Sequence, residues 1–408
     1  MAIQKTDSEL TIKLTQGLSM LPLIAPGSTI YYKKTTFSRL KIDDLVLYRQ
    51  GSEFVCHRVV YKTARYLIAK GDNNLDSDGR IYPSQVVGKL TKVKCGRGII
   101  TPESVYLMQS SHYFKEINQI NQVFSQAQLD YLFLKGLPLH LYFERSHPRR
   151  FYADCDVLID GADLPKAVKI LKKQGYVLAA KKLSPWRISP KRYEPELVFH
   201  KSINGFVVTF DLHQELVFMM TELGKLNWLY PRRLLDKLTA LALATKRTIS
   251  LRQQHYPILK ANLLVLYLAL HLFHHNFVGA ARYQFLEKVI SVERRSSRLK
   301  WPEFNQLIKQ YSLQNYLNPV FTLLKKYYRV SIPINLAVTK LTKTNRLDIF
   351  SEKRRLSAGL TRFGNLFWLS SRPFSLRVLT FVDPTVIFTI LWVTKQYLFG
   401  FKLFQKKP

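Results

Sequence analysis

The sequence predicts a multidomain protein in which an all-β N-terminal region precedes an α+β region with a helical C-terminal part. Short apolar runs separated by turn residues fill the first hundred positions, which is typical of β structure. Helical periodicity dominates from Glu222 to about Tyr328. A length of 408 residues also exceeds one ordinary domain. We expect domains at residues 1–100, 101–240, 241–345 and 346–408.

The composition indicates a globular, strongly basic protein. The chain is 47% hydrophobic and carries 62 Lys+Arg against 28 Asp+Glu, a net charge of +34. Such an excess favours an anionic partner, namely RNA, a nucleotide or an anionic membrane surface. The three cysteines have no metal-ligand spacing, which favours a reducing compartment. No apolar core follows residues 1–7, so we expect a cytoplasmic protein, either free or peripheral to the inner face of the membrane.

The first hundred residues read as a small barrel or folded sheet. Four β runs stand out between turns: Thr29–Tyr32, Asp44–Tyr48, Glu53–Val60 and Tyr66–Ala69. Ser19 follows the glycine of a sharp turn, and His57 lies in the third run. Asp72 and Asp78 lie in a glycine-bounded loop that can offer a carboxylate to a histidine. A serine, a histidine and a carboxylate are the groups that nucleophilic acyl transfer requires.

This ordered set resembles the signal peptidase and LexA-like serine peptidases over roughly residues 10–98. His57 stands where bacterial signal peptidases carry a lysine, so the resemblance is to the endoplasmic-reticulum and archaeal subtype. The resemblance implies an all-β peptidase barrel with Ser19 as nucleophile and His57 as general base. Asp78 aligns with the orienting carboxylate, and Asp72 belongs to the same loop. Because no transmembrane anchor is evident, we expect a cytoplasmic peptide or protein substrate; the alternative is an inactive barrel that binds a peptide.

A boundary at residues 101–104 is followed by an amphipathic helix. Its apolar residues recur at three- and four-residue steps from Ile117 to Leu134, and Gly136 suits its C-cap. Residues 137–142 are predicted as a short strand or a continuation of this helix. A basic stretch with Arg145, Arg149 and Arg150 comes next.

The stretch from Phe151 to Asp160 is predicted to be a strand with two acids on one face. Asp154 and Asp156 are two residues apart, so they share a face of the strand. Asn204-Gly205 predicts a hairpin that returns Asp211 to their side. Clustered carboxylates need a positive partner, and Mg²⁺ matches hard oxygen ligands. The alternative is strand-end acids paired with arginines.

This region resembles the uncharacterised nucleotidyltransferases of the DNA polymerase β superfamily, most clearly over residues 114–236 and more weakly to 345. The resemblance implies an α+β nucleotidyltransferase fold that uses an NTP and two Mg²⁺ ions. It implies that Asp154 and Asp156 bind both metals and that Asp211 binds the one beside the acceptor. The remaining implied residues, which would lie near the phosphates, are Lys135, Gly136, Arg149 and Arg150.

Several histidines and the C-terminal segment leave alternatives open. His213 follows Asp211 and is either a site residue or a structural one. His271 and His275 are one helical turn apart, but no acidic ligand accompanies them, so we do not expect zinc. Residues 346–408 combine arginines with aromatic residues, a pattern suited to stacking on RNA or lying on lipid.

The sequence therefore predicts a bifunctional enzyme. Its first part is a serine endopeptidase, and its second part is a Mg²⁺-dependent nucleotidyltransferase that moves a nucleotidyl group from an NTP to an unknown acceptor. The rival hypothesis is a non-catalytic scaffold that retains both folds and binds a peptide together with RNA or a membrane.

Overall fold

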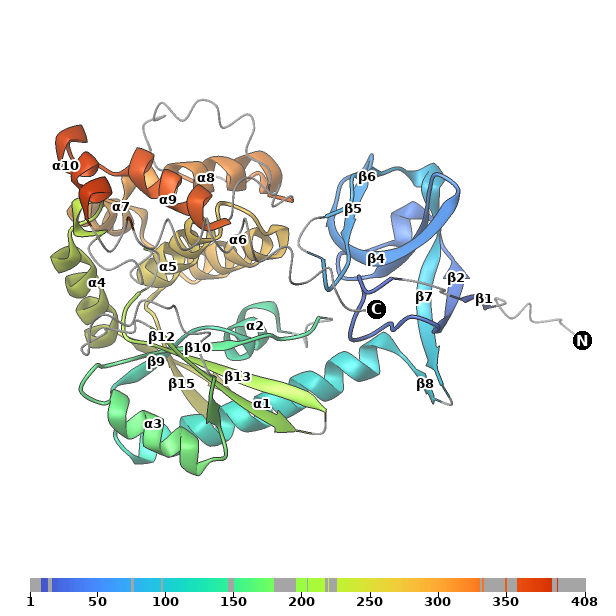
Figure 1. Cartoon of the computed structure of the whole chain (residues 1–408), viewed down its shortest axis with the longest axis horizontal. Coiled ribbons are helices and arrows are strands. Elements are labelled where there is room, and N and C mark those ends of the chain that lie inside the picture. The colour runs from blue at the N-terminus through green and yellow to red at the C-terminus, as the bar shows by residue number, and fades with distance from the viewer. Residues whose placement is uncertain are drawn as a thin grey trace, which may run out of the picture. The chain divides into compact units, whose positions relative to one another are not determined.

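The computed structural model (Figure 1) divides into two compact units. The first comprises residues 1–112, 146–152 and 350–353, and the second comprises residues 113–145, 153–349 and 354–408. The structure describes residues 9–13, 17–74, 77–96, 98–145, 150–179, 196–203, 205–216, 219, 226–330, 332–333, 349–350, 358–383 and 387.

The first unit is an eight-stranded antiparallel sheet whose main strand order is β1-β2-β7-β3-β4-β5-β6, with β8 on β7. The strands are β1 (Leu10–Lys13), β2 (Thr29–Lys34), β3 (Leu45–Gln50), β4 (Glu53–Lys62), β5 (Leu67–Lys70), β6 (Arg80–Ile81), β7 (Val86–Cys95) and β8 (Gly98–Ile100). Two 3-10 turns lie between strands, η1 (Phe37–Arg39) and η2 (Pro83–Gln85).

Alternation along β3 explains why this sheet has two apolar faces. Leu45 and Leu47 pack into one cluster with Ile30 and Val93, whereas Val46 and Tyr48 belong to a second cluster on the other side. A strand that is buried on both faces needs this continuous apolar run. The predicted sheet-rich N-terminal region is confirmed. Among the described residues no pairing joins β1 to β6, so the closed barrel stays a prediction.

The second unit contains a seven-stranded mixed sheet in the order β11-β12-β13-β10-β9-β15-β14. β10 runs parallel to β13 and antiparallel to β9, and β9 pairs in parallel with β15. The strands are β9 (Tyr131–Lys135), β10 (Cys155–Ile159), β11 (Val177–Leu178), β12 (Glu196–Ile203), β13 (Phe206–His213), β14 (Arg247–Leu251) and β15 (Gln254–Ile258).

Helices cover both faces of this sheet. The α1 residues of this unit and α3 lie on one face, while the helices from α5 to α9 lie beyond the other (Figure 1). α5 is apolar all round and almost wholly buried, as expected for a central core helix. The helices are α1 (Pro102–Gln126), α2 (Leu137–Glu144), α3 (Leu164–Lys173), α4 (Arg232–Ala244), α5 (Ala261–His274), α6 (Ala280–Arg295), α7 (Trp301–Gln310), α8 (Gln314–Tyr328), α9 (Ala358–Leu369) and α10 (Phe374–Val378), with 3-10 turns η4 (Leu226–Trp228) and η6 (Leu379–Val382).

The helix expected through Leu134 is shorter than its periodicity indicated. α1 ends at Gln126, Gln128 adopts a positive φ of 55°, and residues 131–135 form β9 instead. The apolar run from Tyr131 to Leu134 fits a fully buried strand as well as it fits a helix face, and pairing with β10 decides between them. Gly136 is therefore not a C-cap; its φ of 112° lies at the start of α2.

Two further expectations have clear outcomes. The hairpin at residue 205 is confirmed, since β12 and β13 pair antiparallel from Ile203–Phe206 outward. The region after residue 222 is not purely helical, because the β14–β15 hairpin completes one edge of the sheet. Among the described helices, none combines the length and the apolar character needed to cross a bilayer.

Phe210 should be a sensitive test of the second unit's core. It is fully buried on β13, immediately before Asp211, and its ring centroid lies 5.3 Å from that of Tyr176. We expect Phe210→Ala to lower the free energy of unfolding by about 3–5 kcal/mol, measured by urea denaturation, because the cavity cannot be refilled. Val207→Ala on the same strand is the control, since Val207 is 53% exposed. Equal losses in the two variants would contradict this account of the core.

Candidate active site

The site is centred on one rung of the second sheet. Asp156 on β10 has Lys135 of β9 as its register partner on one side and Asp211 of β13 on the other. Register partners on neighbouring strands project from the same face, so these three side chains meet. Asp154 precedes Asp156 by two residues and joins them on that face. Cys155, which points to the opposite face, is fully buried.

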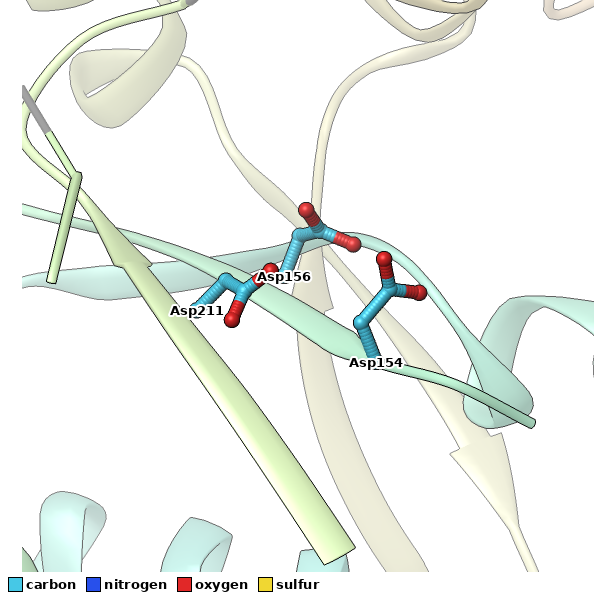
Figure 2. Close-up of side chains that lie close together, drawn as sticks. All are labelled: Asp154, Asp156 and Asp211. Atoms are coloured by element: carbon cyan, nitrogen blue, oxygen red, sulfur yellow. The ribbon is translucent and has the colours of Figure 1, made fainter. Parts of the chain in front are cut away.

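Figure 2 shows the three carboxylates side by side, two from the β10 segment and one from β13. One oxygen from each of Asp154, Asp156 and Asp211 lies within 4.8 Å of the others. Among the described side chains this is the group of acids, cysteines and histidines that could hold a metal ion. The predicted acids are therefore brought together.

Lys135 lies between two of the acids. Its Nζ is 3.3 Å from Asp154 Oδ2 and 3.1 Å from Asp156 Oδ2. Burial by itself lowers the pKa of Lys135, but the charges of Asp156 and Asp154 outweigh it and the pKa is raised. The positive partner that clustered acids require is thus, in part, an ammonium group of this chain.

The acids are held in different protonation environments. Burial raises the pKa of Asp156, but Lys135 and the hydrogen bond from His213 outweigh this, and its pKa is lowered. Burial and the charge of Asp156 raise the pKa of Asp154. The same two causes raise the pKa of Asp211 to about 7. One acid is therefore firmly ionised, and Asp211 can exchange a proton near neutral pH.

His213 belongs to the site as a positioning group. Its Nε2 donates to Asp156 Oδ1 over 2.8 Å, and the ring is buried. Burial lowers the pKa of His213, yet the bond to Asp156 outweighs it and the pKa is raised. The pairing fixes one oxygen of Asp156 and leaves the other to face Lys135. Contacts of this kind orient the ligands in metal sites.

Sequence reasoning missed the positive charge of Arg282. This residue lies in the first turn of α6, and its charge lowers the pKa of Asp154 and of Lys135. A Cβ at residue 279 would lie 2.7 Å from Nη1 of Arg282, so a glycine at this position allows the guanidinium group to lie there. No local pattern predicts this placement, because Arg282 lies far along the chain from the acids.

The donor set fits a magnesium ion. Asp211 Oδ1 is buried and has no hydrogen-bond partner among the described residues. All three donors are carboxylate oxygens, which Mg²⁺ prefers, and among the described residues no sulfur or imidazole belongs to this group of ligand atoms. We therefore regard Asp154, Asp156 and Asp211 as the residues that would hold the ion.

A family model described as uncharacterised nucleotidyltransferase matches residues 104–329. The chain belongs to this family. The matched residues span more than half of the chain and include the three acids, Lys135, His213 and Arg282. Membership of the nucleotidyltransferase family supports a transferase activity. A search among curated proteins finds no match to the chain.

The other predicted residues of the nucleotidyltransferase site have mixed outcomes. Gly136 lies against the acidic segment, since a Cβ on it would be 3.4 Å from the Cα of Cys155 and 3.6 Å from Asp154 O. Arg150 is partly buried, and Arg149 lies outside the described residues. His271 Nε2 and His275 Nε2 are 3.2 Å apart, and burial lowers the pKa of both, so they are neutral.

A second constellation lies in the first unit, outside the matched family. His57 Nδ1 donates to Asp78 Oδ2 over 2.7 Å, and His57 Nε2 accepts from Ser19 Oγ at 2.8 Å. The histidine is buried on β4, and the serine lies in the turn after β1. The three side chains form one continuous hydrogen-bonded chain. This is the order that base-assisted activation of a serine requires.

The loop after β5 holds the Ser19 turn in place. Asn73 N donates to Ser19 O over 2.7 Å, and Asn73 Nδ2 donates to Leu18 O over 3.0 Å. A Cβ at Gly71 would lie 2.7 Å from Ser19 O, so this close approach requires glycine. Asp72 does not serve the histidine; both its oxygens bind Arg58, at 2.7 and 2.6 Å. Of the two predicted carboxylates, Asp78 is the partner of His57.

The pKa of Asp211 predicts a pH dependence of stability. Because its folded pKa is about 7, above the ordinary aspartate value, the folded state holds the proton more tightly. The free energy of unfolding of the metal-free protein should fall as pH rises from about 4 through about 7. We expect Asp211→Asn to flatten this dependence in thermal melts in a chelating buffer. Asp236→Asn, an exposed acid, is the control, and equal pH slopes in wild type and Asp211→Asn would refute the assignment.

Proposed function

We propose that the second unit is a Mg²⁺-dependent nucleotidyltransferase that moves a nucleotidyl group from an NTP to an acceptor hydroxyl. The observation that carries the proposal is the meeting of three carboxylates within 4.8 Å, inside a region that matches a nucleotidyltransferase family. Bound Mg²⁺ would supply a lowered pKa of the acceptor hydroxyl and charge neutralisation on the triphosphate.

The chain's own residues have separable roles in this proposal. Asp154 and Asp156 hold the ions, and His213 keeps Asp156 in its orientation. Asp211 would complete the ligand set of the ion beside the acceptor, and the proton of the acceptor hydroxyl, whose pKa the bound ion would lower, passes to water. The hydroxyl oxygen then bonds to the α-phosphorus, and pyrophosphate leaves with the electrons of the broken bond.

Lys135 and Arg282 are the proposed triphosphate contacts. Both are positively charged and act on the same acid, since Lys135 and Arg282 each lower the pKa of Asp154, and Arg282 also lowers the pKa of Lys135. When the nucleotide enters, Lys135 exchanges its pairing with Asp154 and Asp156 for the phosphates. This exchange keeps the ammonium paired in both states, which matters because an unpaired buried charge is costly.

Asp154→Asn should abolish transfer while sparing the fold. We expect the rate of Mg²⁺-dependent pyrophosphate release from an NTP mixture to fall by roughly 100-fold or more, because an amide is a poor magnesium ligand. The nucleotide-induced rise in Tm should disappear with it. Asp236→Asn is the matched control, since that side chain is 57% exposed and pairs with Arg232 one helical turn away. Wild-type protein without any Mg²⁺–NTP stabilisation would defeat the proposal.

We propose serine endopeptidase activity as a second function, for the first unit. It is supported by the two hydrogen bonds that link Ser19, His57 and Asp78. In the proposed step, Ser19 Oγ bonds to a peptide carbonyl carbon while His57 Nε2 takes the hydroxyl proton. Asp78 holds the ring and stabilises its positive charge. His57 then gives the proton to the leaving amine, and water hydrolyses the acyl-enzyme.

Ser19→Ala should remove both cleavage and the reactive hydroxyl. We expect at least about a thousandfold loss of peptide cleavage, followed by mass spectrometry of a peptide library, because the nucleophile is absent. Labelling of the wild type by an organofluorophosphonate should also be lost. Ser52→Ala, an exposed turn serine, is the control. If the wild type neither cleaves nor takes the label, the non-catalytic peptide-binding scaffold becomes the better description of this unit.

A further inference from the structure

An aromatic cluster on α9, α10 and η6 exposes large rings to solvent. The ring of Phe367 is buried, and its centroid lies 5.3 Å from Trp368, 6.1 Å from Phe374 and 5.2 Å from Phe381. Those three neighbours are 68%, 57% and 46% exposed. The rings are thus packed against one another on one side and open to solvent on the other.

Aliphatic side chains extend the exposed surface along α10 and η6. Together with the three rings they form what we call the aromatic patch, made up of Trp368, Phe374, Val378, Leu379, Phe381 and Val382, each more than a third exposed. Single exposed apolar residues are ordinary, but a contiguous group of this kind marks a surface that contacts something apolar.

Positive charge accompanies the patch. The Arg377 guanidinium lies 5.3 Å from the Phe367 centroid and 5.4 Å from the Phe374 centroid. Residues 354–408 contain nine lysines and arginines and one acid, Asp383, whose side chain is buried. Trp and Phe rings beside arginine are the residues that anchor proteins at the boundary between lipid headgroups and acyl chains.

We infer that the aromatic patch docks the protein on an anionic lipid surface. Transfer of aliphatic side chains such as Val378, Leu379 and Val382 from water into acyl chains is favourable. These side chains have no aromatic face on which a nucleotide base can stack. A second copy of the chain is disfavoured, because each copy carries a net charge of +34 and the copies repel. An anionic membrane satisfies both the apolar and the charged components of the surface.

The sequence beyond the patch has the same character. Residues 384–408 contain no acid, and aromatic residues such as Trp392 and Phe399 alternate there with lysines such as Lys395 and Lys402. Two adjacent stretches with one chemistry favour a shared lipid surface, since one apolar anchor alone gives only marginal membrane binding. This inference does not depend on the nucleotidyltransferase proposal.

Co-sedimentation of the full chain with vesicles tests the inference. We expect binding to vesicles containing phosphatidylglycerol, about tenfold or more weaker binding to pure phosphatidylcholine, and loss of binding as salt is raised. Val382→Asp should weaken binding to the anionic vesicles by about tenfold or more, because it places an acid in the patch. Val177→Asp on β11 is the matched control, since Val177 is 69% exposed and Val382 is 65% exposed.

Trp368→Ser/Phe374→Ser provides a second variant that adds no charge, and its Tm reports whether the fold is intact. Equal binding of Val382→Asp and Val177→Asp to the anionic vesicles would overturn the inference. A wild-type protein that does not bind anionic vesicles would overturn it as well. A wild-type dimer in sedimentation velocity that becomes a monomer in Val382→Asp, without vesicle binding, would assign the patch to a second copy instead.

Discussion

The second unit depends on placing Lys135, Asp156 and Asp211 on one rung of a buried sheet. Parallel pairing of β10 with β13 sets two carboxylates side by side, and antiparallel pairing with β9 adds the ammonium. Like charges on neighbouring strands destabilise a sheet, and burial increases the cost. The arrangement is tolerable because Lys135 and His213 each contact Asp156. The repulsion between the carboxylates of Asp154, Asp156 and Asp211 is thereby concentrated at the place where the proposed cation would relieve it.

Sequence reasoning could predict part of the acid cluster because that part depends on short-range rules. The two-residue period of a strand puts Asp154 and Asp156 on one face, and the turn at Gly205 pairs β13 with β12. Asp211 then meets Asp156 through the parallel pairing of β13 with β10, which no short-range rule gives. In the first unit the roles expected of Ser19 and His57 came from the resemblance to serine peptidases, since the two residues lie 38 positions apart. The residue pattern left Asp72 and Asp78 open, and the resemblance favoured Asp78; in the structure Arg58, the residue after His57, binds Asp72.

The rest of the site could not be predicted because it depends on contacts between distant segments. Periodicity alone cannot separate a buried strand from one face of a helix, so β9 was read as the end of α1. Recognising β9 would have identified Lys135 as the neighbour of Asp156 rather than only a residue near the phosphates. The charge of Arg282 acts on Asp154 from α6, far along the chain, and no local pattern encodes that placement.

The two sites differ in whether their polar groups are paired within the chain. Ser19, His57 and Asp78 form a hydrogen-bonded chain in which each group satisfies the next, so the site is complete without a further ligand. The acid cluster is not complete, because Asp211 Oδ1 is buried and has no hydrogen-bond partner among the described residues. A chain with more than twice as many basic as acidic residues could have supplied a second cation there. Asp211 Oδ1 is therefore the atom through which the proposed magnesium ion would complete the acid cluster.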